Sequence, residues 1–128
     1  MNILKKRSFK IDLFGAKIHL YLCASDDAIL TVANKIIKRF HEDPVDYAVA
    51  GLTFNPDEQL DTVYLFLCPE HLDVNTVTHE TQHILHYIID YYAIDEQNDS
   101  NEVAANLSGY INEKVFAFIK DCGYQITY

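Results

Sequence analysis

The sequence has few cysteines, few basic residues and no long apolar run. Its three cysteines form no Cys-x-x-Cys pair and leave one thiol over. This argues against a disulfide framework or a zinc finger and favours a reducing, cytoplasmic compartment. Ten basic residues against 19 acidic ones give a formal net charge of −9, which argues against a nucleic-acid partner. No apolar run approaches the roughly 18 residues of a membrane span, so no membrane partner is expected.

Signals of targeting, repetition and linkers are missing as well. The basic cluster at residues 5–7 is followed by apolar residues that Asp12, Lys17 and His19 interrupt, so no signal sequence is expected. We find no internal repeat or low-complexity segment. With 128 residues, of which 49% are hydrophobic, the chain suits a single domain over residues 1–128.

The strongest motif is His-Glu-x-x-His at residues 79–83. Apolar residues around it recur at the spacing of a helix: they are Val74, Val77, Ile84, Leu85, Ile88 and Ile89. His79 and His83 are four residues apart, so their imidazoles leave one face of that helix and could bind one tetrahedral Zn²⁺. Glu80 could hold a metal-bound water and accept its proton. The motif therefore indicates a zinc hydrolase site.

A catalytic zinc site needs a third protein ligand, and a second helix is predicted to supply it. This helix begins at residues 99–100, and Glu102 in its first turn could reach the metal across the turn at residues 95–99. Asn106, one turn later, could hydrogen-bond a ligand imidazole. His86 shares a side of the first helix with the histidine pair, and we expect it to support a ligand by a hydrogen bond or to pack the helix. The alternatives are a ligand in place of Glu102 or a proton donor near the site. A first-turn glutamate is also common for electrostatic reasons alone.

The two motifs resemble those of the gluzincins, the thermolysin-like zinc peptidases. These enzymes carry His-Glu-x-x-His on one helix and Asn-Glu-x-x-(Ser/Ala)-Asp on the next, and the matching segments here are residues 79–83 and 101–106. The resemblance implies three metal ligands and one general base: His79, His83 and Glu102, with Glu80 as the base. It covers about residues 60–120 and departs from the pattern at Asn106, where the family has Asp. The chain also resembles small phage or bacterial proteins of this type.

The resemblance implies an α+β, zincin-like fold, with a small antiparallel or mixed sheet packed on an active-site helix and a following glutamate helix. Gluzincins also use a downstream His or Tyr to stabilise the developing oxyanion. Tyr110, two turns past Glu102 on the same side of its helix, is our candidate. The alternatives are Tyr87, Tyr124 and Tyr128.

The remaining elements follow from periodicity and turn residues. Alternation predicts a β-hairpin over residues 8–24, followed by a helix that Ser25 caps. Strands are predicted over residues 47–54 and 60–67. In zincin-type folds the strand before the active helix lies at the sheet edge, where a substrate can add to it, and residues 61–68 fit that place by their order. An ordinary buried strand is the alternative, and the sequence alone does not separate the two. His71 is expected to be a loop or cap residue.

The predicted activity is zinc-dependent hydrolysis of a bond in a peptide or protein substrate, with Glu80 as general base. The chain lacks the second large domain that walls the cleft of thermolysin-like enzymes, so a protein partner could complete the cleft. The alternative is a non-enzymatic binding or assembly protein on a degenerate zincin scaffold, which the small size and Asn106 favour. A third hypothesis, an acidic decoy that binds a basic protein, depends only on the charge.

Overall fold

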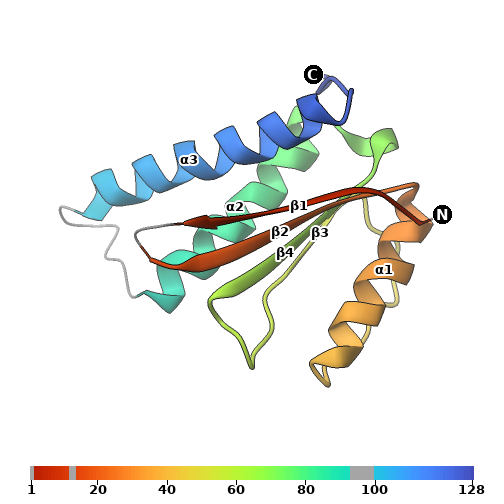
Figure 1. Cartoon of the computed structure of the whole chain (residues 1–128), viewed down its shortest axis with the longest axis horizontal. Helices are drawn as coiled ribbons and strands as arrows, with labels where there is room; N and C mark the ends of the chain where they lie inside the picture. The colour runs from red at the N-terminus through yellow and green to blue at the C-terminus, as the bar shows by residue number, and fades with distance from the viewer. Residues whose placement is uncertain (1, 12–13, 93–99) are drawn as a thin grey trace.

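A four-stranded mixed sheet with helices on both faces organises the structure, a computed structural model that describes residues 2–11, 14–92 and 100–128 (Figure 1). The strands are β1 (Ile3–Ile11), β2 (Ala16–Cys23), β3 (Leu52–Phe54) and β4 (Thr62–Leu67). The helices are α1 (Asp26–Arg39), α2 (Val74–Tyr91), α3 (Ser100–Asp121) and the short 3₁₀ helix η1 (Pro69–His71). The strand order is β1-β2-β4-β3. The predicted α+β class is confirmed.

The predicted hairpin is formed by β1 and β2, which pair antiparallel from Ile3 to Cys23. It begins five residues earlier than the alternation of the sequence indicated, since Ile3 and the exposed residues 5–7 also join the ladder. Gly15 takes a φ of +78°, and its N–H donates to the carbonyl of Ile11 over 2.6 Å. A residue with a Cβ would be strained in that conformation, which explains a glycine at the turn.

The connection from β2 to β4 contains helix α1 and then β3, and β2 and β4 pair in parallel with Leu22 opposite Leu67. The predicted cap is confirmed, because the Ser25 side chain accepts a hydrogen bond from the backbone N–H of Ala28 over 3.1 Å. Two aspartates in the first turn and two basic residues in the last turn match the helix dipole. The parallel register brings the segments that follow β2 and β4 to the same end of the sheet.

Of the two positions that the sequence left open for β4, the sheet edge and an ordinary buried strand, the structure shows the second. β4 lies between β2 and β3, so the three-residue strand β3 forms that edge. The predicted strand over residues 47–54 is correspondingly short, since only Leu52–Phe54 pair with β4. Just before that segment, the backbone N–H and C=O of Val45 are hydrogen-bonded by the side chain of Asn34 on α1.

Alternation along the strands separates two cores. One core lies between the sheet and the pair α2 and α3, and it contains Leu20, Leu65 and Ile84. The other lies under α1 and contains Phe66 and Ile29. Figure 1 shows α2 and α3 on one side of the sheet and α1 on the other. In the described part of the chain, no helix has the length and apolar character needed to span a membrane.

Candidate metal centre on helix α2

Helix α2 forms as the periodicity predicts and presents the motif. Asp73 caps its start: one carboxylate oxygen accepts from the N–H of Thr76 over 2.7 Å, and the other accepts from the Thr76 hydroxyl over 3.1 Å. These hydrogen bonds lower the pKa of Asp73 below its ordinary value. Ile84 and Ile88 are buried against the sheet, whereas His79 and His83 lie on the exposed face.

The structure brings His79 and His83 together. Their Nε2 atoms lie 3.2 Å apart, and the two rings are nearly perpendicular with centroids 4.8 Å apart. Two imidazole nitrogens on one tetrahedral zinc, each about 2.0–2.1 Å from the metal, would lie about 3.3 Å apart. The distance also suits an N–H···N hydrogen bond between two neutral rings. The pair therefore has the separation of a chelate without any change of conformation.

Glu80 is buried beside this pair, with 7% of its surface exposed. Its Oε1 accepts a 2.7 Å hydrogen bond from the hydroxyl of Thr53 on the edge strand β3. Its Oε2 lies 4.0 Å from Nε2 of His79. A Cβ added to Gly51 would approach Cγ of Glu80 to 3.0 Å, so the backbone before β3 packs closely on this side chain. One carboxylate oxygen is thus held by β3, and the other faces the histidine pair.

Tyr87 also belongs to this neighbourhood. Its ring lies nearly parallel to that of His83, with centroids 6.4 Å apart. Burial and then the negative charge of Glu80 raise the pKa of the Tyr87 hydroxyl. Among the tyrosines that the sequence offered as oxyanion donors, Tyr87 is brought beside the motif.

Tyr110 lies elsewhere. Its hydroxyl donates to the carbonyl of Lys10 on β1 over 3.3 Å, and its ring packs edge-on against Phe9 of the same strand. β1 is the sheet edge opposite β3, which contacts Glu80. The hydrogen bond of the Tyr110 hydroxyl is therefore made at the edge of the sheet opposite the one that contacts the motif. The position of Tyr110 along its helix did not reveal this contact with β1.

Glu102 is exposed in the first turn of α3 and does not join the histidine pair. Among the described residues, it belongs to no group of three metal-ligating side chains with donor atoms within 4.8 Å of one another. The helix lengths explain this. α2 continues eight residues past His83, roughly 12 Å at 1.5 Å per residue, while α3 has returned only two residues at Glu102. Asn106 is exposed too, and the turn at residues 95–99 lies outside the described residues.

His86 completes the row of histidines on α2. Its Nε2 lies 3.1 Å from Nε2 of Gln82, and both side chains are exposed. His79, His83 and His86 line one shallow hollow, and every residue that lines it belongs to α2. Within the described part of the chain, the histidines therefore stand on an open helix face, without a wall from a second element.

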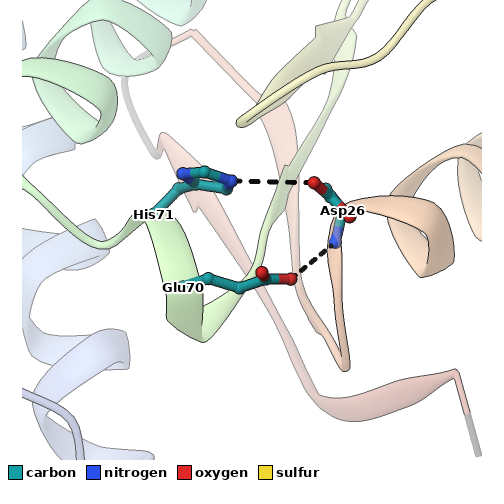
Figure 2. A group of neighbouring side chains, drawn as sticks. All are labelled: Asp26, Glu70 and His71. Atoms are coloured by element: carbon teal, nitrogen blue, oxygen red, sulfur yellow. Dashed lines mark hydrogen bonds and ion pairs between the residues drawn. The ribbon is translucent and has the colours of Figure 1, made fainter.

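A separate group of candidate ligands, which the sequence did not reveal, lies where β2 and β4 end (Figure 2). Asp26, Glu70 and His71 offer donor atoms within 4.8 Å of one another. Glu70 accepts a hydrogen bond from the N–H of Asp26 over 3.2 Å, and Nε2 of His71 lies 3.8 Å from a carboxylate oxygen of Asp26. The three side chains thus already have partners among themselves and the backbone. They also lie at the N-terminus of α1, the positive end of the helix dipole, where a bound cation is disfavoured. We interpret it as a structural cap and ion pair.

Comparison with known proteins adds no relative. No model of a protein family, no curated protein and no solved structure matches this chain. The functional interpretation therefore depends on the geometry around His79, His83 and Glu80.

Proposed function

We propose that the chain is a zinc-dependent hydrolase of peptide bonds, with His79 and His83 as metal ligands and Glu80 as general base. One observation carries the proposal: Nε2 atoms 3.2 Å apart, next to a carboxylate that has one oxygen anchored and the other 4.0 Å from His79. Two corners of a tetrahedral zinc site fit these residues. The third ligand remains the predicted Glu102, which would have to approach from the first turn of α3.

The chain's own residues suit proton transfer. A bound Zn²⁺ would supply a water of lowered pKa and polarise a carbonyl. The Thr53 hydroxyl fixes Oε1 of Glu80, so Oε2 is the oxygen free to accept a proton. The Tyr87 hydroxyl, whose pKa is raised by burial and by Glu80, stays protonated at neutral pH and can donate a hydrogen bond. In this proposal Tyr87 takes the oxyanion role first assigned to Tyr110.

The position of β3 supports an extended peptide as substrate. β3 is the strand at the sheet edge, and its Thr53 contacts Glu80. A peptide that added to this edge as a further strand would bind through its main chain and pass the carboxylate. Because the histidines stand on an open helix face, a protein partner would supply the second wall of the cleft.

Metal content gives the first test. Protein purified without added metal should contain about one zinc per chain, measured by mass spectrometry of the metal, and His79→Ala or His83→Ala should lose it. His86→Ala removes a neighbouring imidazole from the same face and should lower zinc content less than Glu102→Ala does; the opposite order would transfer the third-ligand role to His86. Full zinc content in the double variant of His79 and His83 would refute the ligand assignment. Loss on Glu102→Ala would place α3 in the site.

Catalysis gives the second test. Glu80→Gln keeps the shape and the acceptor for Thr53 but cannot accept a proton, so zinc content should stay and cleavage of a denatured-protein or peptide library should fall about 10²–10⁴-fold. Equal cleavage by wild type and variant would contradict the role of Glu80.

The second candidate function is a non-enzymatic binding or assembly protein on this scaffold. It is favoured by the open face around the histidines and by the place of Glu102 outside any three-ligand group of the described residues. Zinc binding that depends on His79 and His83, together with no cleavage of any library member, would select it over the hydrolase.

A further inference from the structure

A groove lies on the other face of the sheet, between α1 and the start of the β1–β2 hairpin. It has a volume of about 470 Å³, which is in the range of small-molecule sites. Its floor is apolar and aromatic, with Ile3 and Tyr21 from the hairpin and Ile36 from α1. The Tyr21 ring lies on that of Phe66, with centroids 5.2 Å apart, which holds it in place.

Basic side chains from both β1 and α1 also line the groove. Lys6 stands on β1, directly opposite Tyr21 in the hairpin register. Lys35 and Arg39 line the groove from one face of α1, one turn apart. The groove lining contains no acidic residue among the described positions. The ion pairs within 4.0 Å that the described residues form involve none of these three cations.

The rest of the chain makes this cluster unusual. Three of only ten basic residues gather here without a carboxylate partner, although the chain has 19 acidic residues. A charged group at physiological ionic strength is felt over about 8 Å, so a ligand held within the groove experiences mainly these cations. The chain as a whole carries a formal net charge of −9, which disfavours a long polyanion. The charge pattern therefore favours a compact anion.

We propose that the groove binds a compact organic phosphate, with its phosphate groups between Lys6 and the pair Lys35 and Arg39. The planar guanidinium of Arg39 can donate two parallel hydrogen bonds to one phosphate, and the lysines act as point charges. The ligand's flat or apolar body would cover Ile3, Tyr21 and Ile36. This site is independent of the histidine pair, since it lies across the sheet from α2.

The test uses ATP as the probe on the full, isotopically labelled chain, with chelator present so that no metal bridges the phosphates. NMR titration should give saturable shifts confined to amides near residues 2–7, 20–22 and 32–40. Lys35→Glu should weaken binding at least about tenfold, because it replaces a hydrogen-bond donor to the phosphate with a negative charge that repels it. Lys38→Glu is the matched control: it makes the same change on an exposed residue of the same helix, outside the groove lining, and should weaken binding less than about threefold.

Several outcomes would overturn the proposal. Equal losses in the two variants would mean that ATP senses only the overall charge. Tripolyphosphate binding as tightly as ATP would remove any role for the floor. Shifts centred on residues 79–86 would place the anion at the histidines. Tighter binding of an oligodeoxythymidine than of ATP would replace the compact ligand with a nucleic acid.

Discussion

Replacing Thr53 by Val should destabilise the chain through one buried carboxylate. Valine has the shape of threonine and a high strand propensity, so the substitution removes the hydroxyl without disturbing β3. The hydroxyl donates to Oε1 of Glu80 over 2.7 Å and lies 3.2 Å from the Glu80 carbonyl oxygen. A hydrogen bond to a charged group contributes about 1.5–3 kcal/mol, and little water is available to replace it because Glu80 is 7% exposed.

We therefore expect a loss of about 2 kcal/mol in the free energy of unfolding at pH 7, and a melting temperature lower by roughly 6–10 °C. Urea denaturation measures it, and the slope with denaturant should not change. Thr53→Ser keeps the donor and should recover most of the loss. Thr31→Val removes an exposed hydroxyl that bonds a carbonyl of α1, and it should change stability by less than about 0.5 kcal/mol.

A double-mutant cycle isolates the contact. Combining Thr53→Val with Glu80→Gln should cost less than the sum of the two single changes, since the neutral amide forms a weaker bond with Thr53 than the carboxylate does. A loss below about 0.5 kcal/mol for Thr53→Val, or the same loss for Thr53→Ser, would show that the hydroxyl does not hold Glu80 in place.

Three further predictions concern other parts of the chain. Gly51→Ala should lower the melting temperature, since its Cβ would lie 3.0 Å from Cγ of the buried Glu80. Gly109→Ala should raise it, since Gly109 is an exposed helical position and its Cβ would meet nothing within 4 Å. The pKa of Asp73 is lower in the folded chain than in the unfolded chain, so its stabilising effect is fully present above the unfolded pKa and is lost as the pH falls through the folded pKa. The difference in the free energy of unfolding between wild type and Asp73→Ala, measured by urea denaturation, should therefore narrow below about pH 4. Burial raises the pKa of Cys23 to about 12 and of Cys68 to about 11. Iodoacetamide at pH 8 should therefore modify both far more slowly than the partly exposed Cys122, as peptide mass mapping would show.

The sequence predicted the elements whose signals are local. Ser25 caps α1 because its side chain accepts from an N–H three residues ahead, a contact that needs no knowledge of the rest of the fold. The motif helix was likewise readable, since the apolar spacing that buries Ile84 and Ile88 also fixes the face on which His79 and His83 lie. Their spacing along the helix places the two imidazoles on the same face one turn apart, and the side-chain torsions then set the 3.2 Å between the nitrogens.

The sequence did not reveal contacts that depend on how elements pack. Thr53 meets Glu80 only because β3 adds outside β4, and nothing in residues 60–67 shows whether another strand will lie beyond them. The motif spacing likewise does not show how far α2 continues past His83, and that length decides where Glu102 stands.

The group of Asp26, Glu70 and His71 shows the same limit at longer range. Asp26 and Glu70 are 44 residues apart in sequence, and they meet because β2 and β4 run parallel and end together. A single sequence predicts the strands but not how they pair, so from the sequence His71 was expected to be a loop or cap residue. Such groups at the ends of parallel strands become visible only once the strand order is known.

The nine-residue edge strand β1 has a consequence for how copies of this chain behave at high concentration. A free strand edge of that length is a template on which a second copy could pair, but β1 carries Lys5, Lys6 and Lys10 on exposed positions. The isoelectric point expected from the sequence, about 4.9, describes the whole chain, whereas these three lysines are gathered on one strand. Two β1 edges therefore repel each other even when the molecules as a whole no longer do. Protection against strand-to-strand fibre growth is local to this strand and does not depend on the net charge.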